Sequence, residues 1–312
     1  MCTGILIKTK NNKLIFARTL EFGIPFNWVQ YCDDNIIATL GNLPGKKNYY
    51  MTDGLNKHGL LVATFFFPHN DTQYNKAALT NKINIYTGEL NKYLLNNCKN
   101  VSDVIDLLPK LNILETNIDG KLFSLHWAVI DKTGKFIVLE NNNGMTHYYQ
   151  NDANVITNSP TFPEHMQELK QFSFLSKYNK PNSVSQGTGA LGLPGDSSSK
   201  SRFIRANFYQ KNIPLPSNTN EGIKAILRIM HDFDIPLGSV VDRKTKQMEA
   251  TQYTVAYSIN DFYNKYANYG NKFIDNSWKY TGNPVKLCNY TNLLPEMFII
   301  ITIGYFCFTH LK

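Results

Sequence analysis

MCTGILIKTKNNKLIFARTLEF, residues 1–22, consists of two short apolar runs separated by the dipeptide Asn11-Asn12. Asparagine is a common turn residue, and two strand-like runs joined by a short turn predict a β-hairpin. We expect its strands at Thr3–Lys8 and Lys13–Arg18. The hairpin predicts a sheet that begins next to the first residue of the chain.

Cys2 directly follows the initiator Met1, and a small second residue such as cysteine permits removal of that methionine. Removal, which we expect, leaves a thiol and a free α-amino group on one residue. The α-amino group titrates at roughly 7.7–8.0, so about a tenth or more of it is neutral at pH 7 and can act as a base. A thiolate is a strong nucleophile. The N-terminus therefore predicts a nucleophile and its base in one residue.

Arg18 ends the second strand of the expected hairpin, and the two ends of a hairpin come back together. A guanidinium beside Cys2 would lower the pKa of the thiol and hold an acyl oxygen or a carboxylate. Taken alone, each residue has a simpler interpretation. The cysteine can be an inert buried residue, and the arginine can be a surface charge.

Composition limits the possible functions. The chain has 312 residues, of which 43% are hydrophobic and 18% charged, so we expect a large packed core and little disorder. The net charge is +8, but the basic residues are scattered and no helix-turn-helix, zinc-finger or RRM signature is present. We expect no nucleic-acid partner, and an anionic substrate accounts for the charge at least as well. Five cysteines without a C-x-x-C pair argue against zinc and fit a reducing compartment.

The rest of the chain mixes helices and strands. We expect helices at Glu89–Asn97, Asp103–Leu108, Ser201–Tyr209 and Glu221–Asp232, with Ser102 capping the second and Thr219 or Asn220 the fourth. We expect strands at Leu60–Phe67, Phe123–Ile130, Phe136–Glu140, Val155–Thr157 and Tyr253–Ile259, and a loop at Ser183–Ser201. Strands and helices do not alternate regularly, so antiparallel sheets with helices layered on them, an α+β fold, fit better than a doubly wound parallel sheet. No interdomain linker is apparent, which predicts a single domain over residues 1–312.

The two ends of the chain bear on its location. The first residues lack the basic start, apolar core and cleavage site of a secretory signal, so we expect a cytoplasmic protein. Near the other end, Met297–Phe308 is almost continuously apolar but shorter than the roughly 20 residues of a spanning helix. Its β-branched and aromatic residues favour a buried strand. A membrane tether in the apolar tail at 293–312 is the alternative.

Several blocks of the sequence resemble one known family. In chain order they are M-C-T-G at 1–4 with A-R-T-L-E-F at 17–22, D-G-L-N-K-H-G-L at 53–60, L-H-W at 125–127, T-N-S-P-T-F at 157–162, G-T-G at 187–189 with G-L-P-G-D at 192–196 and S-R-F-I-R at 201–205, and T-Q-Y-T at 251–254. They resemble the choloylglycine hydrolases, which include conjugated bile salt hydrolases and penicillin V acylases. That family belongs to the N-terminal nucleophile hydrolases.

The resemblance implies a fold, a mechanism and a set of site residues. The fold is a four-layer αββα sandwich of two antiparallel sheets flanked by helices. No metal and no organic cofactor is implied, and a homotetramer is expected. The implied roles are Cys2 as nucleophile, Arg18 as its electrostatic neighbour, Glu21 as the carboxylate at the amino group, Asn158 and the Phe66 backbone N–H as the oxyanion hole, and Arg202 as an orienting charge. Without the resemblance, Asn158 is an ordinary turn residue and Arg202 a helix-surface charge.

Two positions depart from the family's pattern. Glu21 stands where the family usually has Asp, which keeps the charge but adds a methylene. A shift of 1 Å at a reacting group can cost about a hundredfold in rate. Phe66 stands where bile salt hydrolases have Asn and penicillin V acylases have Tyr. Its backbone N–H can still serve, and its aromatic ring makes the site more similar to the penicillin V acylases.

We therefore predict a hydrolase that cleaves a small-molecule N-acyl amide through a thioester on Cys2, similar to the penicillin V acylases. Conjugated bile salts and N-acyl homoserine lactones are the alternative substrates. A non-catalytic protein that binds acyl ligands is the alternative from another class, for the case that Met1 is retained or Glu21 disturbs the geometry. A membrane-tethered hydrolase is a third possibility.

Overall fold

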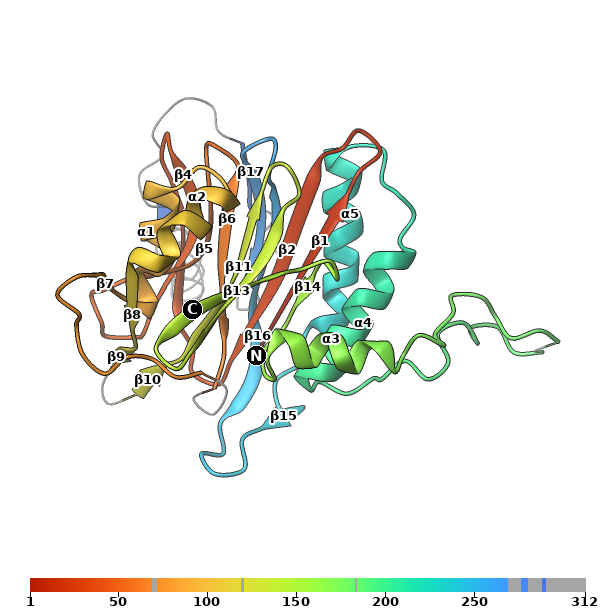
Figure 1. Ribbon diagram of the computed structural model, residues 1–312. Helices are drawn as coiled ribbons and strands as arrows, with labels where there is room; N and C mark the ends of the chain where they lie inside the picture. Colours follow the sequence, from red (N-terminus) through yellow and green to blue (C-terminus); the bar gives the residue numbers. More distant parts are fainter. Residues whose placement is uncertain (69–71, 119–120, 183, 269–275, 280–287, 290–312) are drawn as a thin grey trace, which may run out of the picture.

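The computed structural model describes residues 1–68, 72–118, 121–182, 184–268, 276–279 and 288–289. Two sheets stack face to face, and helices cover the outer face of each (Figure 1). The order of layers is helix, sheet, sheet, helix. The prediction of an α+β sandwich with four αββα layers is therefore confirmed.

The first sheet is built on the predicted hairpin. Strands β1 (Cys2–Lys8) and β2 (Leu14–Phe22) pair antiparallel, with Cys2 opposite Leu20. Asn12 has a φ of 62°, a left-handed value that asparagine adopts more readily than most residues. The hairpin prediction is confirmed, but the predicted end of its second strand was wrong. Strand β2 continues past Arg18 to Phe22, so Arg18 lies opposite Gly4 and Leu20 lies opposite Cys2. The order of strands in this sheet is β14 (Val155–Ile156), β1, β2, β16 (Met248–Ser258), β17 (Tyr263–Asn268) and β18 (Asn276–Lys279), and β15 (Val240–Val241) pairs with β16.

The second sheet contains strands that the sequence patterns did not indicate. Its order is β13 (Met145–Gln150), β12 (Phe136–Asn142), β11 (Leu125–Asp131), β6 (Leu60–Phe66), β5 (Tyr50–Asn56), β4 (Ile36–Asn42), β3 (Asn27–Cys32) and β19 (Cys288–Asn289). Strands β3, β4, β5 and β13 were not predicted. Most residues of β4 and β5 are buried on both faces, so neither strand alternates between apolar and polar residues.

Helices on the two outer faces hold the sheets in place. Helix α1 (Leu90–Asn97) packs on β5 and β6, and α2 (Val101–Leu107) packs on β11. On the other side, α4 (Ser199–Asn212) and α5 (Thr219–Met230) cover the first sheet, and α3 (Phe162–Lys170), which was not predicted, packs against α4. The remaining short elements are η1 (Thr87–Glu89), η2 (Leu108–Lys110), η3 (His231–Phe233), the parallel pair β7 (Ile83–Tyr86) and β8 (Leu111–Leu114), and the pair β9 (Thr116–Ile118) and β10 (Lys121–Phe123).

Several predicted boundaries were wrong. The N-cap of α2 is Asn100, not Ser102, because its side chain accepts the Asp103 N–H. The N-cap of α5 is Asn218, not Thr219 or Asn220. In both cases the capping asparagine lies outside the apolar pattern from which the helix was predicted.

Two further ranges differ from the prediction. The strand expected over Phe123–Ile130 is interrupted at Ser124, where β10 ends and β11 begins one residue later. Helix α4 starts at Ser199, inside the stretch predicted as a loop. The predicted strand at Met297–Phe308 lies outside the described residues. Among the helices that the structure describes, none combines the length and apolar character needed to cross a bilayer.

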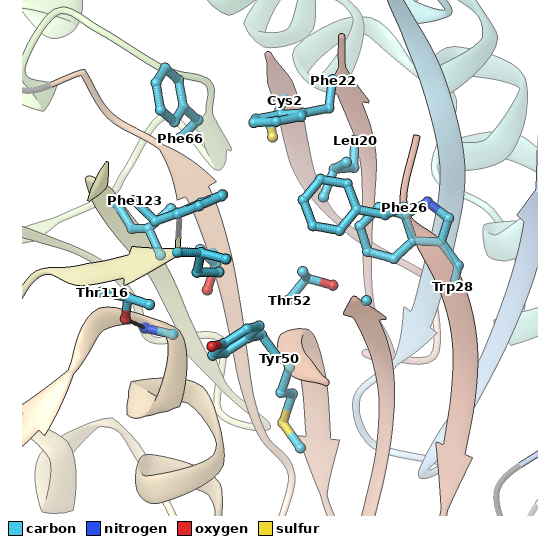
Figure 2. A pocket seen from close by; sticks show the side chains of 16 residues that line it. Cys2, Leu20, Phe22, Phe26, Trp28, Tyr50, Thr52, Phe66, Thr116 and Phe123 are labelled. Atoms are coloured by element: carbon cyan, nitrogen blue, oxygen red, sulfur yellow. Dashed lines mark hydrogen bonds between the residues drawn. The ribbon is translucent and has the colours of Figure 1, made fainter. Parts of the chain in front are cut away.

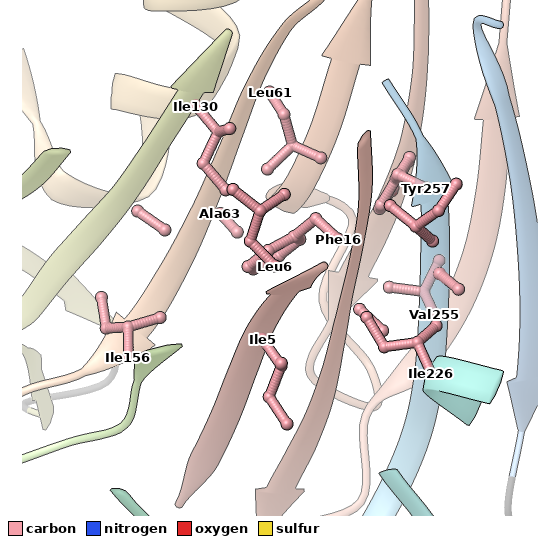
Figure 3. Close-up of a cluster of buried hydrophobic side chains, with 14 of the residues drawn as sticks. Ile5, Leu6, Phe16, Leu61, Ala63, Ile130, Ile156, Ile226, Val255 and Tyr257 are labelled. Carbon is pink, nitrogen blue, oxygen red and sulfur yellow. The ribbon is translucent and has the colours of Figure 1, made fainter. Parts of the chain in front are cut away.

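The main core lies between the sheets and continues beneath α4 and α5. Side chains from both sheets interdigitate there, including Leu6 and Phe16 from the first and Leu61 and Ile130 from the second (Figure 3). Complete burial of such a side chain stabilises the fold by about 1.5–3 kcal/mol. A second core lies between the outer face of the second sheet and helices α1 and α2. The two cores fix the relative position of β1, β2 and β6, whose ends carry the site.

Candidate active site

Cys2 lies where β1 begins, between a polar cluster and an apolar pocket. Its side chain is 3% exposed, carries a free thiol and lines the pocket (Figure 2). Its backbone instead contacts polar side chains. The polar cluster is here defined as Asn158, Arg202 and Glu21 together with the backbone of Cys2.

Asn158 is the link between the polar cluster and strand β6. Its Oδ1 accepts hydrogen bonds from the Cys2 N–H at 2.8 Å and from Arg202 Nη2 at 2.8 Å. Its Nδ2 donates to the Phe66 carbonyl at 2.7 Å. Because two donors face one end of the amide and a carbonyl faces the other, the orientation of the amide is determined. An amide nitrogen carries two hydrogens, so Nδ2 has a second one available after bonding Phe66.

Arg202 extends from α4 toward the start of β1. It is 1% exposed, and besides Asn158 its guanidinium donates to the Cys2 carbonyl and to Thr3 Oγ1. Burial lowers the pKa of this guanidinium, whereas the negative charges of Glu21 and Cys2 act in the opposite direction. A buried arginine with these partners orients the backbone of Cys2 from one side.

Arg18 is fully buried beneath the site and is held by strands of both sheets. Its Nη1 donates to the carbonyls of Thr64 at 2.6 Å and Thr52 at 3.3 Å and lies 3.5 Å from Asp53 Oδ2. Its guanidinium carbon lies 4.7 Å from the centre of the Phe65 ring. The charges of Tyr253, Cys2 and Asp53 raise the pKa of Arg18 against the effect of burial, so the side chain stays charged.

Three residues behind Arg18 were not predicted to have a role. Asp53 is fully buried and accepts the hydroxyl hydrogens of Tyr253 at 2.5 Å and Tyr257 at 2.6 Å. Asp53 and Tyr253 belong to the D-G-L-N and T-Q-Y-T blocks of the sequence, which is the signal that could have identified them. The group orients a buried carboxylate toward Arg18.

Glu21 is also buried without a complete set of partners. Its Oε1 accepts from Thr251 Oγ1 at 3.1 Å, and its Oε2 has no hydrogen-bond partner among the described residues. Burial raises the pKa of this carboxyl, while the N-terminal charge and Arg202 act to lower it. Met1, which the structure includes, donates from its amine to the Glu21 carbonyl at 2.7 Å and lies 3.3 Å from Glu249 Oε2.

An apolar pocket of about 700 Å³, counting the open space at its mouth, begins at Cys2. No charged side chain lines it. Its walls are Phe22, Phe26 and Trp28 on one side and Phe66 and Phe123 on the other, with Tyr50 at the end far from Cys2 (Figure 2). The remaining lining residues are Leu20, Gly41, Met51, Thr52, Thr64, Gly88, Thr116, Ile118 and Leu125.

Phe22 connects the two walls of this aromatic pocket. Its ring stacks on Phe123 with centroids 6.4 Å apart and an interplanar angle of 15°. It meets the Phe66 ring edge to face at 6.3 Å. Since β2 belongs to the first sheet and Phe66 to the second, the pocket lies between the two sheets at the end of the sandwich. The enclosed surface fits an apolar acyl group.

The residues selected from the sequence therefore lie together. Cys2, Asn158 and Arg202 are joined directly by hydrogen bonds, and Phe66 joins them through its carbonyl. Arg18 interacts with Cys2 through charge, and so does Glu21 with Arg202. Among the residues that the structure describes, no group of three or more His, Cys, Asp or Glu side chains is arranged to hold a metal ion.

Known proteins match this chain over most of its length. An uncharacterised protein of Paramecium bursaria Chlorella virus 1 is 38% identical over 267 residues, covering 83% of this chain and 94% of its own. A bile salt hydrolase/transferase of Clostridium perfringens is 28% identical and covers 94% of this chain and 98% of its own. The crystal structure of a mutant of the conjugated bile acid hydrolase from Clostridium perfringens, with alanine in place of its second-position cysteine, superposes with a TM-score of 0.81 at 26% identity, covering 93% and 97% of the two chains.

A family model confirms the assignment made from the sequence blocks. The model for linear amide C–N hydrolases of the choloylglycine hydrolase family matches residues 2–277. The match includes all the residues of the polar cluster and of the aromatic pocket. The chain belongs to the choloylglycine hydrolase family and is a hydrolase of linear amides.

Proposed function

We propose that this hydrolase uses Cys2, freed by removal of Met1, as the nucleophile that forms a thioester with the acyl group of an N-acyl amide. The observation that carries the proposal is the position of Cys2. Its thiol lines an uncharged aromatic pocket, while its nitrogen lies 2.8 Å from Asn158 Oδ1 in the polar cluster. An acyl carbon in the pocket would meet the sulfur, and the departing nitrogen would meet the amine.

The reaction balances with groups from this chain and one water molecule. The Cys2 amine takes the thiol proton, and the sulfur attacks the amide carbon. The C–N bond then breaks as the ammonium returns this proton to the leaving amine. Water, deprotonated by the same amine, attacks the thioester, and the carboxylic acid leaves as the thiol is restored. Asn158 Oδ1 would hold the amine in place during both steps.

Two donors are available for the oxyanion. The first is the second hydrogen of Asn158 Nδ2, because the other one bonds the Phe66 carbonyl. The second is the Phe66 N–H, since the N–H and C=O of one residue in an extended strand point to the same side. Leu125, opposite Phe66 on β11, bonds the Tyr74 hydroxyl with both its N–H and its carbonyl, which supports this direction. Such donors are each worth roughly a hundred- to a thousandfold in rate.

The charged side chains have separate roles in the proposal. Arg18, kept charged by its surroundings, would attract the negative charge that the Cys2 sulfur carries when it attacks. Arg202 orients the Cys2 carbonyl and Asn158. The unpaired oxygen of Glu21 would accept a hydrogen from the new α-ammonium group. Glu21 thereby takes the part that the family usually gives to Asp.

The aromatic pocket supports an acyl group that is bulky and uncharged. Phenoxyacetyl, the acyl group of penicillin V, is the first candidate, because Phe22, Phe66 and Phe123 can surround a single aromatic ring. Conjugated bile salts are the second candidate. The observation that favours them is the likeness over nearly the whole chain to a protein named as a bile salt hydrolase.

We also propose a single domain that assembles as a homotetramer in the cytoplasm. The support for assembly is the segment between α3 and α4, which projects from the sandwich (Figure 1). Phe174 and Tyr178 in this segment are 64% and 74% exposed. Exposed aromatic side chains on a projecting segment are typical of a contact with another subunit. The free thiols of Cys2 and Cys98 are consistent with a reducing compartment.

A variant of the nucleophile tests the proposal. Wild-type protein, Cys2→Ala and the control Cys32→Ala are incubated with penicillin V, glycocholate and taurocholate, and the released amine is measured. Wild type and Cys32→Ala should release amine, and Cys2→Ala should release none. Intact-mass spectrometry should show Met1 absent, and acid quenching should trap an acyl adduct on wild type. Turnover by Cys2→Ala, or by protein that retains Met1, would contradict the proposal.

A further inference from the structure

Two buried histidines contact the backbone of Thr157 and Asn158, here called the Asn158 loop, and do not enter the mechanism above. His126 on β11 is 2% exposed and His165 on α3 is 3% exposed. Each ring stacks face to face on a phenylalanine, His126 on Phe67 at 4.3 Å and His165 on Phe203 at 4.5 Å. Stacking fixes the plane of each imidazole and therefore the direction of its N–H groups.

Both rings are directed at consecutive backbone carbonyls. His126 Nε2 lies 3.0 Å from the Thr157 carbonyl oxygen, and His165 Nε2 lies 2.8 Å from the Asn158 carbonyl oxygen. A carbonyl oxygen can only accept, so in both rings Nε2 carries the hydrogen. The Nδ1 atom of each ring is buried without a hydrogen bond among the described residues, and His126 Nδ1 lies 3.5 Å from the Glu140 carboxylate.

The two carbonyls belong to residues that follow the last strand residue, so no strand pairing holds them. Strand β14 ends at Ile156, so neither Thr157 nor Asn158 belongs to a strand of the sheet. The Asn158 N–H is held by Ser199 Oγ at 2.9 Å. The backbone of Asn158 is thus held at both of its polar groups, and its side chain reaches Cys2, Arg202 and Phe66.

We propose that His126 and His165 are positioning residues that hold the Asn158 amide at the oxyanion hole by donating their Nε2–H groups to the Thr157 and Asn158 carbonyls. This proposal rests on the proposed function. Burial lowers the pKa of His165 to about 4, so at neutral pH the ring is uncharged. Loss of a donor would let the loop move, and a displacement of about 1 Å at a reacting group costs on the order of a hundredfold in rate.

Paired substitutions separate the donor from the ring. His165→Phe keeps a planar ring on Phe203 but removes the donor, and His165→Gln restores an N–H near the position of Nε2. His126→Phe and His126→Gln make the same comparison against Phe67. His147, exposed on β13, supplies the control variant His147→Phe. Because each histidine is replaced in two ways, the test still gives a result if one of the four variants does not fold.

The measurements are kcat and KM for penicillin V and glycocholate, the rate of Cys2 alkylation by iodoacetamide, and Tm. Alkylation forms no oxyanion, so a positioning role leaves it unchanged. We expect His165→Phe and His126→Phe to lower kcat roughly ten- to a hundredfold, with KM and alkylation within about twofold of wild type. The Gln variants should recover most of the loss.

Two results would overturn the positioning role while the proposed function stands. The first is wild-type kcat in both Phe variants, with Cys2→Ala inactive. The second is a fall in kcat that is matched by an equal fall in the alkylation rate and is not recovered by Gln. Turnover by Cys2→Ala would overturn the proposed function and the positioning role together, so the two failures are distinguishable.

Discussion

The backbone side and the sulfur side of Cys2 differ in charge and in the kind of contact that holds their residues. The polar cluster on its backbone side consists of buried charges and amides joined by directed hydrogen bonds. The aromatic pocket on its sulfur side has no charged side chain and is held by ring contacts. Hydrogen bonds to charged groups are lost abruptly when geometry changes, whereas aromatic contacts change gradually with shape. We infer that most side chains for reaction chemistry and most side chains for substrate choice lie on opposite sides of Cys2.

Removing the charge from the polar cluster should give the largest effect. Arg202→Met removes the guanidinium that donates to both Asn158 Oδ1 and the Cys2 carbonyl, which leaves Oδ1 with the Cys2 N–H alone. We expect turnover to fall at least a thousandfold and the free energy of unfolding to fall by about 3–5 kcal/mol. Kinetics of amine release and urea denaturation check both expectations. The exposed Arg228 gives the control Arg228→Met, and equal effects of the two variants would contradict a special role of Arg202.

A neutral side chain at Glu21 should have a smaller effect with a distinct pH signature. A carboxylate near the α-amine favours its protonated form, so Glu21→Gln should lower the pKa of the amine. The acid limb of the kcat/KM profile should then move to lower pH, and the maximal rate should fall about tenfold. Glu21→Asp keeps the charge and should keep the wild-type limb. An unchanged pH dependence of kcat/KM in Glu21→Gln would contradict an influence of this carboxylate on the pKa of the amine.

A change in the aromatic pocket should alter binding more than chemistry. Phe22→Ala removes the ring that contacts both Phe66 and Phe123. The loss of an aromatic contact surface worth about 1.5 kcal/mol or more should raise KM for penicillin V about tenfold. We expect kcat to stay within threefold. Steady-state kinetics decide, with exposed Tyr148→Ala as the control. A fall in kcat at constant KM would show that the pocket and the chemistry are not separate.

The last prediction concerns stability and leaves the reaction rate aside. His165 has a pKa of about 4, against 6.5 in an unfolded chain, because of burial and of the nearby charges of His126, Arg202 and Lys200. The unfolded chain therefore binds more protons between these values, and stability is lost as pH falls from 6.5 toward 4. The total is roughly 3 kcal/mol. Urea denaturation of wild type and His165→Phe at pH 7 and pH 5 should show a shallower loss in the variant. His147→Phe should retain the wild-type pH dependence.

The parts of the fold that the sequence predicted have local signals. The hairpin was correct because Asn11-Asn12 marks its turn and both runs are apolar. Strands β4 and β5 were missed because burial on both faces removes the period of two. The N-caps Asn100 and Asn218 were missed because several adjacent residues can cap, and only the backbone geometry selects one.

The candidate site shows the same division. Cys2 and Arg18 lie on the two strands of one hairpin, so the pattern of the first residues indicated that they are close, although Arg18 pairs with Gly4 and not with Cys2. Asn158 and Arg202 are 156 and 200 positions from Cys2, and only the resemblance brought them together. The carboxylate of Asp53 and the phenols of Tyr253 and Tyr257 meet across two sheets. No local pattern in the sequence encodes such a contact.

Strand β6 limits how this enzyme could be re-engineered. Its last residues contribute to both the pocket and the charged groups. The side chains of Thr64 and Phe66 line the aromatic pocket, and the Phe65 ring lies beneath Arg18. The Thr64 carbonyl accepts from Arg18, and the Phe66 carbonyl accepts from Asn158. A one-residue insertion or deletion in this strand would exchange its faces and remove both functions together. Grafting a pocket from another family member should therefore succeed at Phe22 or Phe123 and fail when β6 is the exchanged segment.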